Sequence, residues 1–185
     1  MHHARRGFTL IEALVVVTMI GIMSAIVIPR FRVSEATNVR QAARQLAGDL
    51  ELARTRALST TSMVRVVFNT AAQSYSGYLD NNRDGAFAQS VTETNALGAF
   101  QMRLLTNGVR MARGATPNVP GMTGAGAITL PGSRVEFATQ GITNPFGTTG
   151  VIYLTSANDA NAVAAVSVSA AAGVRVWVYK GGAWQ

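Results

Sequence analysis

The sequence predicts an α+β fold, in which a long N-terminal helix packs its outer half on an antiparallel β-sheet domain. Three observations support this prediction. The chain opens with a long apolar run, continues with an amphipathic helical pattern, and then changes to short alternating stretches separated by loops rich in Gly, Pro, Asn and Thr. A helix followed by many short strands is typical of an antiparallel sheet that covers that helix.

The apolar run from Phe8 to Ile28 contains 21 residues and a single charge, Glu12. A helix rises about 1.5 Å per residue, so this run reaches roughly 30 Å, the thickness of the hydrocarbon core of a membrane. The alternative is a buried core helix, which a soluble protein of 185 residues seldom makes so long. We therefore predict a transmembrane helix over residues 8–29, preceded by a short basic stretch over residues 1–7.

A secretory signal peptide is the other targeting interpretation of this run. Its apolar core is usually shorter, and a small-residue cleavage site follows it. Here the run ends in Ile28-Pro29-Arg30, which is a poor cleavage site. Arginines flank the run on both sides, so the distribution of positive charge does not fix the orientation of the helix.

The junction between the basic stretch and the apolar run carries a motif, because Gly7 precedes Phe8 and Glu12 is the fifth residue of the apolar segment. The stretch from Gly7 to Glu12 resembles the class III leader of type IV prepilins and type II secretion pseudopilins. The resemblance implies that a prepilin peptidase cuts after Gly7 and that Phe8 becomes the N-methylated mature N-terminus.

The same resemblance implies an assembly role for Glu12, which would face the cationic N-terminus of a neighbouring subunit in a fibre. An ionised carboxylate in a dry interior persists only beside a compensating charge, so this role is physically reasonable. The alternative for Glu12 is an interfacial carboxylate that reaches water.

The implied partners are other pilin or pseudopilin subunits, the prepilin peptidase and an inner-membrane assembly platform. The implied location is the bacterial inner membrane, with a single span, the leader inside and the globular domain in the periplasm or within a cell-surface fibre.

Residues 30–59 continue as an amphipathic helix. Apolar residues recur at intervals of three and four, and most charged residues lie off this stripe, which indicates one face packed on a sheet. The stripe consists of Val39, Ala43, Leu46, Leu50, Ala53 and Ala57. We expect one long helix over residues 8–59, with a bend near Pro29, a weak point at Gly48 and a solvated charged face.

Residues 60–185 form the predicted β-rich domain, because the period of the pattern changes to two after Ser62. The expected strands are 63–68, 75–79, 100–105, 109–112, 134–138, 150–155, 163–169 and 173–179. The region resembles the pilin architecture, and more narrowly the GspH/FimT-like minor pilins. Major pilins usually close a C-terminal loop with a disulfide, which this chain cannot make because it has no cysteine.

Composition argues against catalysis. Cysteine is absent and both histidines lie in the leader, so the mature chain lacks the usual zinc ligands and the usual nucleophile–base pairs. The carboxylates are scattered, and no G-x-S-x-G elbow is present. We predict a protein that is not an enzyme and needs no cofactor. The net charge of +7 permits contact with nucleic acid or acidic lipid without requiring it.

The turn at Asp80, Asn82, Asp84 and Gly85 has the spacing with which calcium-binding loops begin. The twelfth position of such a loop is Val91 here, where a bidentate Glu should close the shell. Asp and Asn also favour polar hairpin turns, in which they bond their own backbone. We expect a hairpin turn and keep a weak calcium site as the alternative.

Alternation near the C-terminus predicts a strand with valines on its buried face and larger side chains on the other. The valines are Val174, Val176 and Val178. The residues on or beside the other face are Arg175, Trp177, Tyr179, Lys180 and Trp184. They could pack structurally, dock another subunit, or stack on bases and pair with phosphates.

Three functional hypotheses follow. The first is a minor pilin or pseudopilin built into a type IV pilus or a type II secretion pseudopilus, or placed at its tip. The second is a membrane-anchored periplasmic protein that never polymerises. The third, and the main alternative to the first, is a FimT-like pilin that binds DNA in natural transformation. Some FimT-like pilins use a Gly-Arg-x-Arg motif, whereas the matching stretch from Gly173 to Val176 has one arginine, in a different position.

Overall fold

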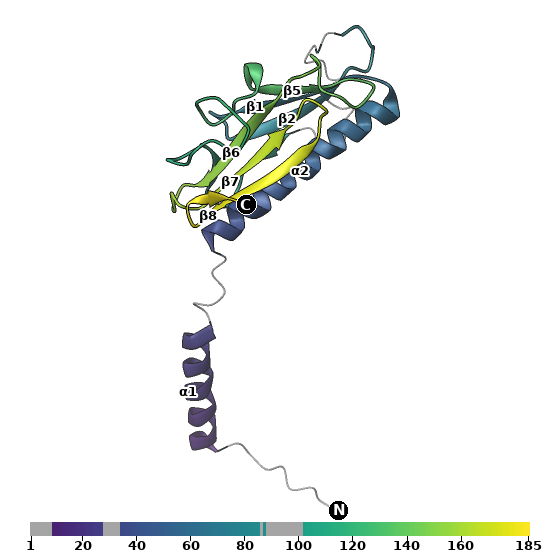
Figure 1. The fold of residues 1–185 in the computed structure, drawn as a ribbon. Helices are drawn as coiled ribbons and strands as arrows, with labels where there is room; N and C mark the ends of the chain where they lie inside the picture. The colour runs from purple at the N-terminus through teal and green to yellow at the C-terminus, as the bar shows by residue number, and fades with distance from the viewer. Residues whose placement is uncertain (1–8, 28–33, 86, 88–101) are drawn as a thin grey trace, which may run out of the picture. The chain divides into compact units, whose positions relative to one another are not determined.

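The computed structural model describes residues 9–27, 34–85, 87 and 102–185, which fall into two units divided after Ser34. Figure 1 shows the helix of the first unit, α1 (Leu10–Val27), and the helix and strands of the second. Both ends of the predicted transmembrane helix over 8–29 lie outside the described residues. No helix within these described residues has both the length and the apolarity needed to cross a membrane.

Helix α1 has apolar side chains on all sides. Its large apolar residues between Leu10 and Met23 are exposed in the single chain, with exposed fractions that reach 86% at Leu10. A helix that is apolar all round is normally surrounded by protein or lipid. The exposed surface of α1 therefore favours contact with protein or lipid.

Helix α2 (Glu35–Thr60) is amphipathic as predicted. All six residues of the apolar stripe are at most 1% exposed, and the helix passes through Gly48 without interruption. The prediction of one helix from 8 to 59 needs correction, because Ser34 is not helical and α2 begins at Glu35. Serine is a residue type that favours the position just before a helix, where the backbone leaves helical geometry. Pro29 lies outside the described residues.

The strands form two antiparallel sheets. The first has the order β3-β2-β1-β5 and the second the order β4-β6-β7-β8-β9. The strands of the first sheet are β1 (Val64–Asn69), β2 (Ser74–Leu79), β3 (Arg103–Leu104) and β5 (Arg134–Phe137). The strands of the second are β4 (Val109–Met111), β6 (Gly150–Ser156), β7 (Val163–Val168), β8 (Val174–Lys180) and β9 (Ala183–Trp184).

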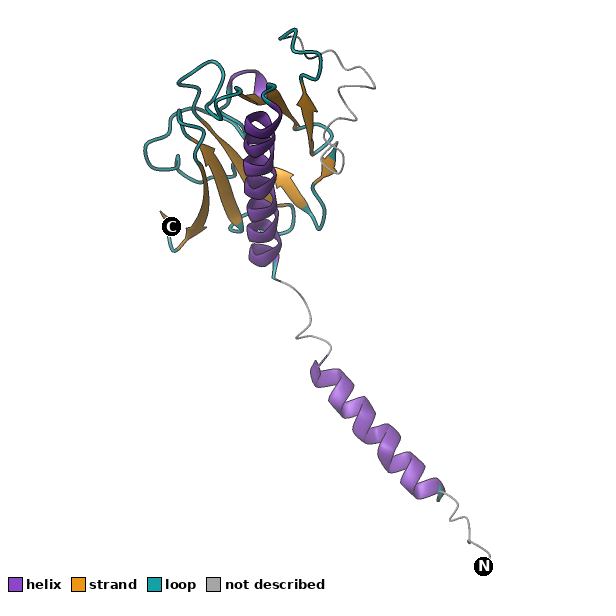
Figure 2. Cartoon of the chain, turned by 90° about the vertical axis from the view of Figure 1, so that its right-hand side faces the viewer, coloured by secondary structure: helices purple, strands orange, loops and turns teal. Residues whose placement is uncertain are grey.

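Helix α2 packs against strands of both sheets, and Figure 2 shows it lying across them. Its stripe joins residues of β1, β5, β6 and β7 in one hydrophobic core. A second, smaller core lies on the other side of β6 and β7 and contains Val119, Val151, Tyr153 and Ala165. Alternation explains the division, because Ile152 and Leu154 belong to the main core while Val151 and Tyr153 belong to the smaller one.

The period-two pattern located these strands well. Each predicted strand overlaps an observed one, and the α+β fold with antiparallel sheets on a helix is confirmed. The short strand β9 was not predicted, because two residues carry no periodicity. The valines of β8 are only half-buried, which corrects the prediction that they are buried. The reason is that β8 pairs with β7 from Val174 to Val178, whereas β9 pairs with its other edge only at Tyr179 and Lys180.

Candidate functional site

The first candidate site is the N-terminal motif. Gly7 and Phe8 lie outside the described residues, whereas Glu12 lies in the first turn of α1 and is exposed. The backbone N–H of Glu12 donates to Oγ1 of Thr9 at 3.3 Å and to the carbonyl of Thr9 at 3.1 Å. Thr9 therefore caps the helix. The pattern Thr-x-x-Glu is the sequence signature of a capping box, a signal that the sequence analysis did not use.

Carboxylates are favoured in the first turn of a helix, because the unpaired backbone N–H groups there carry partial positive charge. Glu12 thus has a local reason to occupy this position. The capping geometry leaves its carboxylate at the N-terminal end of an otherwise apolar helix.

The second candidate site is the C-terminal strand, where the larger side chains are brought together. The guanidinium of Arg175 lies 4.0 Å from the ring centre of Trp177, and Nε1 of Trp177 donates to Oγ of Ser167 at 2.9 Å. Trp177 also packs against the smaller hydrophobic core. Arg175 itself is exposed.

Trp184 closes the other end of this group. Its ring centre lies 5.1 Å from that of Tyr179 and 5.9 Å from that of Tyr153. Its Nε1 donates to the carbonyl of Pro117 at 3.1 Å. The indole groups of Trp177 and Trp184 are therefore engaged within the domain. This geometry favours structural packing of the aromatic residues over a free surface on which bases could stack.

The Asp80 turn is held by its own backbone. Asp80 is 2% exposed, and its two carboxylate oxygens accept hydrogen bonds from the N–H groups of Asp84, at 3.2 Å, and Gly85, at 3.0 Å. Nδ2 of Asn82 donates to Asp84 at 2.8 Å. Such bonds are typical of polar turns built by Asp and Asn. Within the described residues, no group of three His, Cys, Asp or Glu side chains is placed to hold a metal ion.

Two buried polar networks were not predicted. In the first, Oδ2 of Asp49 on α2 accepts a hydrogen bond from the hydroxyl of Tyr75 at 2.7 Å and lies 2.6 Å from Nε of Arg103. Asp49 is only 7% exposed, although it lies off the apolar stripe of α2. Burial of the phenol, followed by its hydrogen bond to Asp49, raises the pKa of Tyr75. The network ties α2 to β2 and β3.

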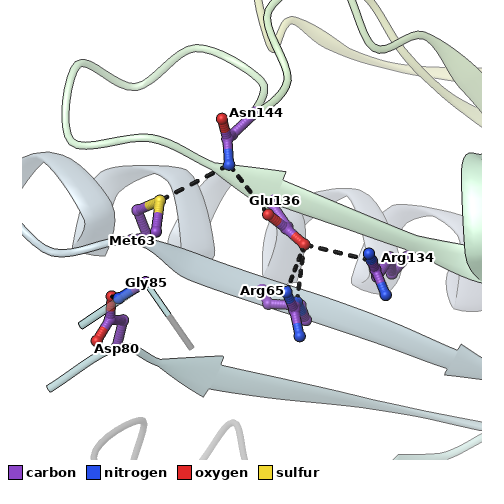
Figure 3. A network of polar contacts seen from close by, with 7 residues as sticks. All are labelled: Met63, Arg65, Asp80, Gly85, Arg134, Glu136 and Asn144. Carbon is purple, nitrogen blue, oxygen red and sulfur yellow. Dashed lines mark hydrogen bonds and ion pairs between the residues drawn. The ribbon is translucent and has the colours of Figure 1, made fainter. Parts of the chain in front are cut away.

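The second network surrounds Glu136 on β5 (Figure 3). Its Oε1 lies 2.7 Å from Nη2 of Arg65 and 3.3 Å from Nε of Arg134. Its Oε2 accepts a hydrogen bond from Nδ2 of Asn144 at 3.1 Å. Arg65 and Glu136 are direct neighbours across β1 and β5, so only the register of these strands reveals the pair. Because every partner belongs to the domain itself, the network is structural.

Two comparisons with known proteins bear on this chain, one on its N-terminal sequence and one on its fold. Residues 2–28 match the family described as the prokaryotic N-terminal methylation motif. The type IV minor pilin FimU of Pseudomonas aeruginosa (strain PAO1) is similar in structure, with a TM-score of 0.52 and 12% sequence identity. That similarity covers 80% of this chain and 93% of the FimU chain.

The minor pseudopilin EpsH from the Type 2 Secretion System of Vibrio cholerae is similar to the same degree. The TM-score is 0.51 at 10% identity, and the similarity covers 76% of this chain and 97% of that chain. At these identities the similarity concerns the fold, an N-terminal helix packed on antiparallel sheets.

The chain thus combines a match to the N-terminal methylation motif over residues 2–28 with a fold similar to those of a type IV minor pilin and a minor pseudopilin.

Proposed function

We propose that this chain is a minor pilin or pseudopilin, a structural subunit that enters a type IV pilus or a type II secretion pseudopilus, within the fibre or at its tip. The observation that carries the proposal is the combination of a methylation motif over residues 2–28 with a pilin-like domain. The proposed role is assembly rather than chemistry.

In this proposal, a prepilin peptidase cuts between Gly7 and Phe8 and Phe8 is then N-methylated. The subunit waits in the bacterial inner membrane with a single span, its domain in the periplasm, until the assembly platform extracts it. Residues 8–29, of which α1 is the described part, serve as anchor before assembly and as stem afterwards.

Burial of the apolar surface of α1 drives assembly in this proposal. Fully burying one Val, Leu, Ile or Met side chain contributes about 1.5–3 kcal/mol, and α1 exposes many of them. Stems of other subunits, like lipid, can cover this surface. Because apolar packing is not directional, the pairing of Glu12 with the N-terminal amine of a neighbour would fix the stagger between stems.

Deletion of the gene tests the function. We expect loss either of sheared surface pilin or of exoprotein secretion, with recovery when the gene is returned. Loss of pilin assigns the subunit to a pilus, and loss of secretion assigns it to a pseudopilus. Unchanged piliation and unchanged secretion, together with absence of the chain from isolated fibres, would contradict the proposal.

A processing assay provides the second arm of this test. The full chain, incubated in membranes with and without prepilin peptidase, should lose the leader only when the peptidase is present. Gly7→Ala should change this processing, whereas Gly21→Ala should not, because Gly21 lies within α1, where an added Cβ meets no neighbouring atom within 4 Å. An uncleaved wild-type chain would contradict the proposed route.

A further inference from the structure

A hollow of about 450 Å³ lies between the first turns of α2 and the end of β8. Ala36 and Arg40 of α2 line one side, and Tyr179, Lys180 and the turn that follows them line the other. The hollow lies within the second unit, at the end of α2 where the chain enters from α1. Among the described residues that line it, two are cationic and none is acidic.

The two cations lack carboxylate partners within the described part of the chain. The Nε atom of Arg40 is buried and has no hydrogen-bond partner there. The ion pairs described involve neither Arg40 nor Lys180. A buried donor without a partner costs about 1–3 kcal/mol, and more when the group is charged. A ligand that supplies an acceptor would remove this cost.

The acidic groups nearest in sequence are engaged elsewhere. Glu35 accepts hydrogen bonds from Oγ of Ser156 at 2.7 Å and from Nδ2 of Asn158 at 3.3 Å. Oδ1 of Asp159 accepts the backbone N–H of Asn161 at 2.9 Å. Neither carboxylate lines the hollow. The positive charge of the hollow is therefore not neutralised by these neighbours.

We propose that this hollow, the Arg40–Lys180 pocket, binds an acidic side chain of a neighbouring subunit. Guanidinium groups favour carboxylates because their planar N–H groups match the two carboxylate oxygens. The hollow is large enough to admit an acidic side chain, whereas duplex DNA requires an extended track of cations along its backbone. This inference rests on the proposed function, because assembly into a fibre would bring neighbouring subunits into contact with this domain.

The turn after β8 is formed by Gly181 and Gly182, which line the pocket. Gly181 and Gly182 have φ values of 62° and 85°, as a two-residue hairpin turn of the primed type requires. A Cβ added at either glycine would meet no atom within 4 Å. Arg40 lies in the second turn of α2, which is anchored in the main core by Val39. The pocket thus has two fixed walls and an open entrance.

Binding can be measured without a fibre. We would titrate the isotope-labelled full chain in detergent micelles with N-acetyl-glutamate amide at constant ionic strength, and follow the side-chain Nε–H signal of Arg40 and the amides of Gly181 and Gly182 by NMR. We expect saturable shifts, and none with N-acetyl-glutamine amide. Arg40→Gln should weaken binding by at least about tenfold, because the guanidinium supplies the charge-assisted bonds.

Arg44→Gln is the matched control, since Arg44 is exposed on the same helix and does not line the pocket. It should bind like the wild type. Equal responses to the two amino-acid amides, wild-type binding by Arg40→Gln, or an equal response to inorganic phosphate would overturn the proposal. Tight binding of a short DNA duplex at the same signals, without response to the glutamate compound, would assign the pocket to nucleic acid instead.

A test in cells links the pocket to assembly. Arg40→Glu should reduce the amount of this subunit in the fibre fraction at least about tenfold relative to Arg44→Glu, because like charges would face each other across the contact. Equal incorporation of the two variants would overturn the docking role. If the wild type itself never enters a fibre, the proposed function fails, while the micelle titration still decides whether the pocket binds carboxylates.

Discussion

Thr9 caps helix α1 by accepting, through its Oγ1, the backbone N–H of Glu12 at 3.3 Å. The two residues therefore stand in a capping relationship. Glu12 has two separable properties, the local preference for an acidic or amide residue three positions after the cap and the negative charge required for pairing with another subunit. Substitutions that remove one property and keep the other can tell them apart.

We predict that Glu12→Gln is processed normally but enters the fibre at least about tenfold less than the wild type, because a neutral amide is a poor partner for a cationic amine. Gln is compatible with the capping box, so the helix end is retained. Glu12→Val should also be processed and should also fail to assemble. Immunoblots of sheared fibres and of membranes measure both steps.

Thr9→Val is the matched control, since it removes the cap and keeps the carboxylate. Loss of a cap costs about 0.5–2 kcal/mol, which the burial of α1 in a fibre greatly exceeds. Thr9→Val should therefore assemble. If Glu12→Gln assembles as well as the wild type while Thr9→Val does not, capping rather than charge pairing explains Glu12.

Tyr75 should make the stability of the folded domain depend on alkaline pH. Burial and the hydrogen bond to Asp49 raise the pKa of Tyr75 above its ordinary value of 10.0. Below pH 10 the phenol is protonated in both the folded and the unfolded chain. Above pH 10 only the unfolded chain releases this proton, so the free energy of unfolding falls by up to about 1.4 kcal/mol per pH unit.

Tyr75→Phe should show a smaller loss of stability between pH 10 and pH 11, because it removes the titrating group and keeps the ring. Urea unfolding of the full chain in detergent, followed by circular dichroism at a series of pH values, measures the difference. Parallel pH profiles for the two proteins would show that Tyr75 does not contribute. At neutral pH the same substitution should cost about 1 kcal/mol, the value of one hydrogen bond.

Within the Glu136 network, the loss in the free energy of unfolding on substitution should increase with the burial of the residue that is replaced. Glu136→Gln should lower the free energy of unfolding by about 2–3 kcal/mol, because it leaves two arginines without a countercharge beside a carboxylate site that is only 10% exposed. Arg134→Gln should cost under about 1 kcal/mol, since that side chain is 50% exposed and screened by water.

Arg65→Gln should fall between these two, because its guanidinium is 21% exposed and contributes the shortest contact to Glu136. Urea midpoints of the three variants measure the order. A loss at Arg134→Gln as large as that at Glu136→Gln would contradict the ranking and would place the stabilising contact at the exposed edge of β5.

Local sequence patterns were enough to predict the helices and strands, whereas tertiary contacts determine which polar residues are buried. The intervals from Val39 to Ala57 predicted the buried face of α2, because a helix repeats its faces every 3.6 residues. The burial of Asp49 was missed, because its partners Tyr75 and Arg103 come from strands distant in sequence. A charged residue beside an apolar stripe gives no local sign of such partners.

The candidate sites follow the same division. The methylation motif is contiguous, so the sequence alone carried it. The Arg40–Lys180 pocket joins two segments separated by most of the domain, and no spacing rule connects them. The capping relationship of Thr9 with Glu12 was available as a Thr-x-x-Glu pattern. Glu12 therefore has a local role at the helix end that does not depend on assembly.

Gly48 offers a test of whether α2 is weakened where the sequence suggested. The helix continues through Gly48, which is exposed, and an added Cβ would meet no neighbouring atom within 4 Å. Gly48→Ala should therefore raise the free energy of unfolding by about 0.5–1 kcal/mol, because alanine loses less backbone freedom on folding.

Gly141→Ala is the opposite case, since Gly141 has a φ of 71° and its Cβ would lie 2.9 Å from the side chain of Leu58. It should lower stability by about 1–3 kcal/mol, the usual cost of a strained backbone position. Thermal unfolding of both variants in detergent measures the contrast, and a destabilised Gly48→Ala would mean that this turn of α2 needs the freedom of glycine.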